Sequence, residues 1–240
     1  MPAGGLVTAF NDSNLMGKGI VFVQLVMSIF TWGLMIGKGN QLRNMKRGCA
    51  DFGRTFARDV EDVMGLYLSS RNREDSPFNT IYQKTCERLI KFFDRDRRTA
   101  MIAAKSSGNV GEPITAKEID LICGTAEHAL AEQILDVEKG MSSLATMSTA
   151  APLIGLLGTV WGMLSAFQCF GADSTGQLAA MAPAISAAML TTVTGLFVAI
   201  PSGIGYNMLY GKVREINIEL EGFVDELTGR MAYEFQGKGD

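Results

Sequence analysis

Residues 140–172 read GMSSLATMSTAAPLIGLLGTVWGMLSAFQCFGA, and residues 174–211 read STGQLAAMAPAISAAMLTTVTGLFVAIPSGIGYNMLYG. Neither run contains Asp, Glu, Lys, Arg or His, and only Asp173 separates them. Each run exceeds the roughly 20 apolar residues that a helix needs to cross the hydrocarbon core of a bilayer. We therefore predict a hairpin of two transmembrane helices, with span 2 at 140–172 and an external turn plus span 3 at 173–211.

A third charge-free run, Gly19–Gly37, lies between Lys18 and Lys38. Its length suits one more span, which we place at 17–38. A signal peptide is the alternative, but basic residues follow the run in place of a small-residue cleavage site. Because the run shows no polar stripe, we expect span 1 to be an outer helix that faces lipid. The predicted fold class is an all-α integral membrane protein with three spans.

Basic residues at the ends of the spans predict their orientation. They follow spans 1 and 3, whereas the turn between spans 2 and 3 carries only Asp173. By the positive-inside rule, the N-terminal arm at 1–16 lies outside and the C-terminus lies in the cytoplasm. The insertion at 39–139 is then cytoplasmic. It carries nearly equal numbers of basic and acidic residues, which argues against nucleic-acid binding.

Apolar residues recur at helical spacing through the insertion. We expect one helix around Phe52 and Phe56, and a second from about Phe78 to Ile102. A loop at 106–113 follows. Thr115 and Glu118 then have capping-box spacing, which marks the start of the helix that leads into span 2. We predict that spans 2 and 3 both extend as long helices into a cytoplasmic helical domain. The first of these is one helix from about residue 116 to 170.

The other extension is the C-terminal helix at 212–240, which carries an apolar seam. The seam needs a partner, either the insertion or a neighbouring subunit. Its residues are Val213, Ile216, Leu220, Phe223, Leu227 and Met231.

The cysteines and the single histidine show no catalytic or metal-binding pattern. The cysteine spacings match no zinc or redox motif, so we interpret all four as packing residues. His128 has no matched Cys or Ser, and we interpret it as structural. We therefore expect no enzyme activity, no bound metal and no cofactor. The cysteines are Cys49, Cys86, Cys123 and Cys169.

Small residues recur at three- and four-residue steps along both helices of the hairpin. Such stripes let transmembrane backbones approach closely. They can pack the two helices of one subunit or serve a ring of subunits, and both alternatives stay open. We expect Pro152, Pro183 and Pro201 to contribute to packing and kinks as well. The stripes comprise Ala151, Gly155, Gly158, Gly162 and Ser165 in span 2, and Ala188, Thr192, Gly195, Ala199 and Gly203 in span 3.

Four hydroxyls lie at mid-membrane depth in the hairpin, on Thr159, Thr191, Thr192 and Thr194. A membrane threonine commonly bonds back to a carbonyl of its own helix. Four of them near one depth on adjacent helices favour instead a polar lining for an ion pathway. No carboxylate or histidine lies in any span, so a proton relay needs an acid from another chain.

Two stretches of the hairpin resemble a known family. Residues 151–163, APLIGLLGTVWGM, are similar to the second-span motif of the MotA/TolQ/ExbB proton-channel family. Residues 182–192, APAISAAMLTT, with Gly195 and Pro201, resemble its third-span motif. The order of outer arm, one span, cytoplasmic insertion and hairpin resembles the TolQ and ExbB branch more than MotA.

This resemblance implies a homopentamer in a bacterial inner membrane, around a single-span ExbD/TolR-like partner that supplies a membrane Asp. It implies a stator-like subunit of a motor that uses an ion gradient to energise outer-membrane transport or integrity. The pore threonines of the family fall on Thr159 and Thr192. The third-span Glu of many members is Ala187 here, which leaves sodium open beside the favoured proton. A structural scaffold that oligomerises without conducting ions is the alternative.

Overall fold

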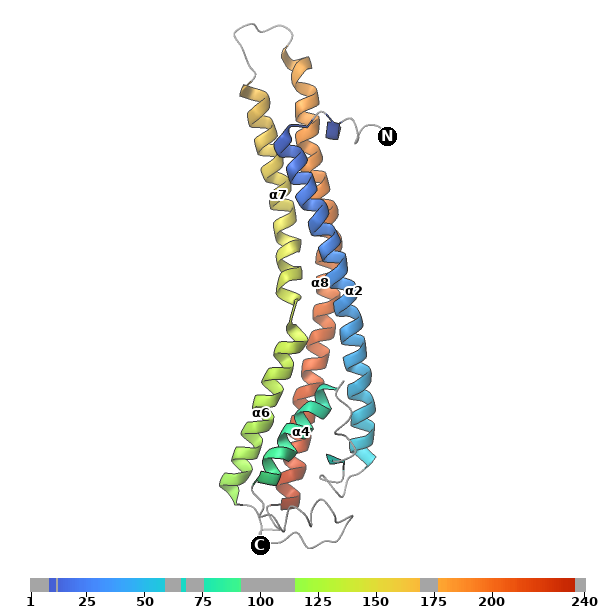
Figure 1. Cartoon of the computed structure of the whole chain (residues 1–240), viewed down its shortest axis with the longest axis vertical. Coiled ribbons are helices and arrows are strands. Elements are labelled where there is room, and N and C mark those ends of the chain that lie inside the picture. The colour runs from blue at the N-terminus through green and yellow to red at the C-terminus, as the bar shows by residue number, and fades with distance from the viewer. Residues whose placement is uncertain are drawn as a thin grey trace. The chain divides into compact units, whose positions relative to one another are not determined.

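The computed structural model describes residues 9–11, 13–58, 66–67, 76–91, 115–168 and 177–235, and helices are the regular secondary structure in this part of the chain. The predicted loop at 106–113, Cys169, Asp173 and the end of the second insertion helix lie outside these residues, as do 1–8 and 236–240 of the predicted end segments. The long helices are α2 (Leu15–Arg58), α4 (Pro77–Lys91), α6 (Ala116–Glu138), α7 (Met141–Gln168) and α8 (Gln177–Phe235), as labelled in Figure 1.

Three helical stretches in the described part of the chain are long and apolar enough to cross a membrane. They are 15–58, 116–168 and 181–234. Each overlaps one of the predicted spans. This composition supports the predicted class, an all-α integral membrane protein.

The chain divides into two compact units. The apolar unit comprises 1–39 and 140–210, and the charged unit comprises 40–139 and 211–240. α7 belongs to the apolar unit, and α4 and α6 belong to the charged unit. α2 and α8 each contribute residues to both units.

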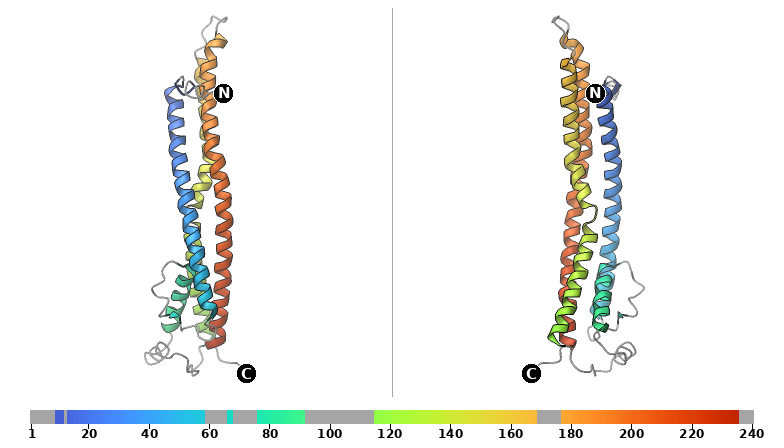
Figure 2. Two further views of the ribbon diagram at one scale, coloured as in Figure 1. Left: turned by 90° about the vertical axis from the view of Figure 1, so that its right-hand side faces the viewer. Right: turned by 60° about the vertical axis from the view of Figure 1, so that its left-hand side comes forward.

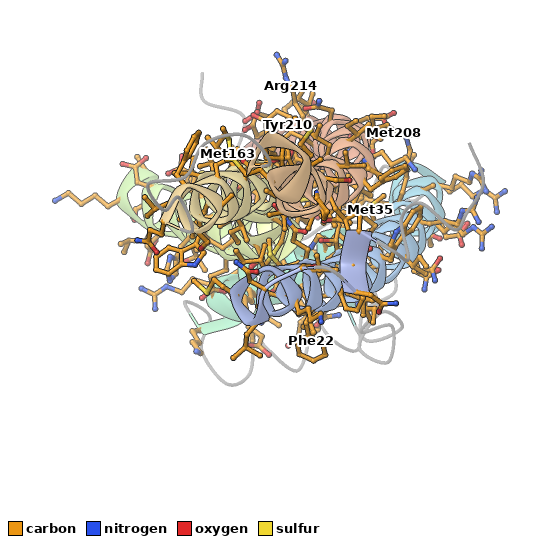
Figure 3. The ribbon with its side chains drawn as sticks, turned by 90° about the horizontal axis from the view of Figure 1, so that it is seen from above. Phe22, Met35, Met163, Met208, Tyr210 and Arg214 are labelled. Atoms are coloured by element: carbon orange, nitrogen blue, oxygen red, sulfur yellow. The ribbon has the colours of Figure 1, made fainter. Side chains whose placement is uncertain are left out.

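Within the apolar unit, α7 runs beside the first part of α8, and α2 packs along this pair of helices (Figures 1 and 2). Ala151, Val198 and Ala199 form a buried cluster against which Met27 of α2 packs. The outer faces carry large apolar side chains that are well exposed, and Phe22 points away from the other helices in Figure 3. Such a continuous apolar surface is what a hydrocarbon environment covers.

α2 extends beyond the predicted span 1, through the predicted helix around Phe52 and Phe56, and ends at Arg58. It also has a polar face: Gln24 and Thr31 are only 1% and 2% exposed, whereas Phe22 on the outer face is 67% exposed. The prediction of a helix without a polar stripe was therefore wrong, because two polar residues seven positions apart lie on one helix face and turn inward.

The predicted continuous helix from 116 to 170 was also wrong. α6 ends at Glu138 and α7 begins at Met141. Between them, Gly140 has a φ of 86°, a left-handed conformation that glycine adopts without the Cβ clash of other residues. That conformation interrupts the helical hydrogen-bond ladder. The start of α6 agrees with the prediction: the Thr115 N–H and hydroxyl donate to the Glu118 carboxylate over 2.8 and 2.7 Å, which lowers the pKa of Glu118.

The apolar seam of α8 is buried in the charged unit by residues of the same chain. All six seam residues are less than 5% exposed. The Phe223 ring centroid lies 4.4 Å from that of Phe78 on α4 and 5.3 Å from that of Phe56 on α2. The Arg230 guanidinium lies 4.5 Å from the Phe56 ring centroid and donates to the Phe56 carbonyl. Of the two partners considered, the insertion therefore covers the seam.

Ion pairs and buried thiols complete the charged unit. Lys84 of α4 pairs with Glu132 of α6, and this bond lowers the pKa of Glu132. Cys49 and Cys86 are buried, and burial raises the pKa of both thiols. The exposed side chain of His128 lies 3.7 Å from the Glu132 carboxylate.

Candidate functional site

The contact between α7 and α8 is close because glycines line it. A Cβ added to Gly158 would lie 2.4 Å from the Thr191 hydroxyl oxygen, and one added to Gly162 would lie 2.6 Å from the Ala188 Cβ. A Cβ on Gly155 would lie 2.7 Å from the Thr191 carbonyl. Nothing larger than hydrogen fits at these positions unless the neighbouring atoms shift. The structure thus places these glycines in a contact inside one chain.

The close approach brings side-chain hydroxyls of α8 to the backbone of α7. Thr191 is buried, and its hydroxyl lies 3.0 Å from the Gly155 carbonyl oxygen and 2.7 Å from the Ala188 carbonyl oxygen. The Thr192 hydroxyl also donates to the Gly155 carbonyl, over 3.1 Å. A single carbonyl of α7 is therefore shared by two threonines of α8.

Thr159 completes this arrangement from α7. Its hydroxyl oxygen lies 3.3 Å from that of Thr192, and the Leu156 carbonyl oxygen, at 2.7 Å, is an alternative acceptor for its proton. Both threonines are partly exposed. The pair therefore opens toward the surface of the apolar unit, where a further polar group has access to it.

Thr194 is bonded to α2. Its hydroxyl donates to the side-chain carbonyl oxygen of Gln24, and the Leu190 and Thr191 carbonyls are alternative acceptors at 3.0 Å. The Gln24 amide in turn donates to the Thr191 carbonyl over 3.0 Å. The structure brings the four predicted threonines together in one set of hydrogen bonds, which we call the threonine cluster.

Acceptors on the same helix, which were the alternative for these threonines, lie within reach as well. Thr159, Thr191 and Thr194 each have a carbonyl three or four residues earlier as an acceptor. A hydroxyl has one proton and two lone pairs, so such a bond still leaves the oxygen free to accept. Intrahelical bonding and an oxygen-lined site are therefore compatible.

The three prolines lie inside helices. α7 continues through Pro152, and α8 continues through Pro183 and Pro201. Proline has no N–H, so each removes one bond of the helical ladder. Ala187 is buried beside a small pocket that Ser13, Asn14, Gly17 and Thr191 help to line.

Gln24 is the residue of this site that the sequence patterns did not identify. Span 1 was assigned from its apolar composition, and one amide does not alter that composition. A sequence signal exists nonetheless, because Gln24 and Thr31 are seven residues apart in an otherwise apolar run. Polar residues inside a span usually face the interior of a helix bundle.

The cluster offers oxygen atoms and no titratable group. Hydroxyl and carbonyl oxygens can bind water or a hard cation, but they do not exchange protons near neutral pH. No Asp, Glu, Lys, Arg or His occurs in α7 or in residues 177–211 of α8. The arrangement can line a path for an ion, and proton transfer along it needs an acid from outside the cluster.

A sequence model described as the MotA/TolQ/ExbB proton channel family matches residues 90–222. This match covers more than half of the chain, including all four threonines of the threonine cluster on α7 and α8. The chain belongs to this family. The family was predicted from the two motifs in the hairpin, and that prediction is confirmed.

Relatives in the TolQ/ExbB branch of the MotA/TolQ/ExbB family are similar over most of their length. Tol-Pal system protein TolQ of Haemophilus influenzae is 30% identical over 234 residues, which cover 93% of this chain and 94% of the relative. Biopolymer transport protein ExbB of Neisseria meningitidis serogroup A is 26% identical over 215 residues, which cover 89% and 90%. TolQ of Pseudomonas aeruginosa is 27% identical over 221 residues, with 89% of each chain covered.

Proposed function

We propose that this chain is the stator-like ion-channel subunit of a motor of the ExbB–ExbD or TolQ–TolR type. It sits in the bacterial inner membrane and uses an ion gradient to energise envelope processes such as outer-membrane transport or integrity. The single observation that carries this proposal is the threonine cluster: four hydroxyls joined by hydrogen bonds in a hairpin that carries no charge apart from Asp173.

The proposed topology places the N-terminus outside and the C-terminus in the cytoplasm. The basic residues after spans 1 and 3 support it. The charged unit, 40–139 with 211–240, is then cytoplasmic, and the apolar unit lies in the bilayer. Exposed apolar side chains on α2, α7 and α8 of the apolar unit support contact with lipid and with other helices.

The proposed partner is a single-span protein of the ExbD/TolR type with an Asp in its span. The chemistry of the cluster supports this, because a proton path needs a titratable group and the hairpin lacks one inside the bilayer. Copies of this chain surround the partner, and a homopentamer is the proposed arrangement. The partly exposed pair Thr159 and Thr192 is then available to the partner's carboxyl group.

The proton is the favoured ion, and sodium is the second candidate. A pathway of hydroxyl and carbonyl oxygens suits a hard cation, and at the position of the third-span Glu of many members this chain has Ala187. A proton pathway instead needs the carboxyl group of the partner. A flux assay with a proton gradient and then with a sodium gradient distinguishes these two ions.

The test is reconstitution of this chain in lipid vesicles, with and without a single-span protein of the ExbD/TolR type from the same organism. A pH-sensitive dye and a sodium-sensitive dye inside the vesicles report which ion enters under an imposed gradient. We expect co-purification of the two proteins and flux only when both are present. Flux abolished by an Asp→Asn change in the partner span supports the proposal. A stable oligomer that conducts neither ion beside its partner contradicts it and favours the scaffold.

A further inference from the structure

Gln24 of α2 is a buried polar side chain that none of the sequence motifs of the hairpin includes. It is 1% exposed and has both of its polar atoms bonded to α8. The amide nitrogen donates to the Thr191 carbonyl over 3.0 Å, and the amide oxygen accepts from the Thr194 hydroxyl. A backbone carbonyl only accepts, so the NH₂ group has to face Thr191. The chemistry therefore fixes the orientation of the amide.

Two glycines make room for this amide. A Cβ on Gly195 would lie 2.9 Å from the Gln24 amide nitrogen, and one on Gly155 would lie 3.2 Å from it. These are also two of the glycines at which α7 and α8 meet. The Gln24 side chain therefore reaches the point where the two helices of the hairpin cross, and it does so from the third helix.

Polar contacts through Thr191 and the Gly155 carbonyl connect Gln24 to the pair Thr159 and Thr192. Gln24 holds the carbonyl of Thr191, whose hydroxyl oxygen lies 3.0 Å from the Gly155 carbonyl oxygen. Thr192 donates to the same carbonyl and lies opposite Thr159. A shift of Thr191 along α7 changes the position of Thr192 by the same amount, because the two residues are adjacent in one helix.

We propose that Gln24 is a positioning residue for the ion pathway: its amide bonds α2 to the Thr191 carbonyl and the Thr194 hydroxyl, and so holds Thr192 opposite Thr159. This inference rests on the proposed function, since it assigns Gln24 a role in that same pathway. Gln24 itself is bonded to neither Thr159 nor Thr192, because the hydrogen bonds of its amide go to Thr191 and Thr194. It acts through Thr191 and through the register of α8 on α7.

Removal of the amide need not unfold the helix pair. Thr194 has the Leu190 and Thr191 carbonyls as alternative acceptors, each at 3.0 Å. Leu has nearly the volume of Gln and no polar atom to satisfy. The variant Gln24→Leu therefore removes both bonds to α8 while leaving no buried group of Thr194 unpaired.

Thr31 provides a matched control on the same helix. It is 2% exposed, seven residues after Gln24, and its hydroxyl has no hydrogen-bond partner among the described residues. Thr31→Val thus removes a buried hydroxyl of α2 without removing a bond. Any general effect of changing the polarity of this buried face appears in both variants, whereas an effect of positioning appears in Gln24→Leu alone.

Gln24→Glu tests the role in a second way. A protonated carboxyl group donates through its O–H to the Thr191 carbonyl and accepts from Thr194, as the amide does. An ionised carboxylate cannot donate and is repelled by that carbonyl. No Asp, Glu, Lys, Arg or His lies in α7 or in 177–211 of α8, and the nearest such residues on α2 are Lys18 and Lys38. The only new titration in this variant is therefore that of position 24.

The experiment measures ion flux in vesicles that contain the complex of this chain with its partner, at several pH values and equal assembled protein. We expect Gln24→Leu to lower flux about tenfold. Two interhelical hydrogen bonds of average strength in a membrane protein change an equilibrium constant by about this factor. Thr31→Val should conduct as wild type does. Gln24→Glu should conduct at low pH and lose flux as pH rises, with a step that the wild type lacks.

Wild-type flux in Gln24→Leu, or a Gln24→Glu profile that matches the wild-type profile, overturns the proposal. If Gln24→Leu fails to assemble, the Gln24→Glu profile decides. If the wild type conducts no ion, the proposed function has failed. Thermal unfolding of Gln24→Glu, Thr194→Val and their double variant then tests the bonds alone. If the changes in melting temperature of the two single variants sum to that of the double variant, and position 24 adds no pH dependence, the hydrogen bonds of Gln24 are overturned too.

Discussion

The hydroxyl oxygens of Thr159 and Thr192 lie 3.3 Å apart, although 33 residues separate them in the chain. Thr192 reaches this position because it also donates to the Gly155 carbonyl, at the point where glycines bring α7 and α8 together. The polar pair is thus a product of close helix packing. Predictions about the pair and predictions about the packing can be tested separately.

The Thr192 hydroxyl is expected to serve ion flux and to contribute little to folding. Thr192→Val keeps the shape and removes one hydrogen bond, an interaction worth about 0.6 kcal/mol on average between membrane helices. We expect assembly at wild-type levels and a strong loss of ion-driven activity. Thr192→Ser keeps the hydroxyl and is the matched control. If the Val variant is as active as the Ser variant, the hydroxyl lies outside the pathway.

Gly158→Ala tests the packing. The added Cβ would lie 2.4 Å from the Thr191 hydroxyl oxygen, so α7 and α8 must separate or Thr191 must lose its bonds. Overpacking of this kind typically costs about 1–3 kcal/mol. We expect a lower melting temperature in detergent. Gly33→Ala on α2 is the control, because nothing lies within 4 Å of its added Cβ. Equal melting temperatures for the two variants would contradict the close contact.

At Gly140 there is room for a larger side chain, but the backbone conformation disfavours any residue other than glycine. Its φ is 86°, and no atom lies within 4 Å of a Cβ built there. Gly140→Ala should therefore destabilise the folded chain by about 1–2 kcal/mol, the cost of a left-handed conformation for other residues. Gly140→Asn should cost less, since asparagine visits that region more often. A chemical-unfolding series compares them, and an Ala variant as stable as wild type indicates an uninterrupted helix.

The thiols of the charged unit should react in an order set by burial. Burial raises the pKa of Cys86 and Cys49, and the thiolate is the reactive form. Cys123 is less buried, and partial burial with the nearby Asp120 and Glu127 carboxylates raises its pKa as well, by less than full burial raises that of Cys86. Near neutral pH we expect a maleimide to label Cys123 first and Cys86 only after unfolding. Raising the pH should speed labelling of Cys123 well before Cys86, since a raised pKa keeps the thiol protonated to higher pH. Rapid native labelling of Cys86 would contradict the packing of α4.

The pattern of charges in the sequence predicted the helical class and the three apolar spans. Charge-free runs longer than a bilayer is thick have few structural solutions, because every backbone group must be bonded internally in lipid. The four threonines were identified for the same reason, since polar residues are conspicuous in an apolar run. The seam of α8 was identified from its spacing. None of these inferences needed to know which helix contacts which.

The break at Gly140 and the role of Gln24 were decided by tertiary structure. The periodicity of apolar residues continues through Gly140, and periodicity reports the faces of a helix but not the φ of one residue. Gln24 looked like one polar residue in a lipid-facing helix, and only the three-dimensional arrangement shows Thr191 and Thr194 within its reach. Hydrophobic patterning acts along one element at a time. The partners of a buried polar atom come from other elements, so their identity depends on how the helices pack.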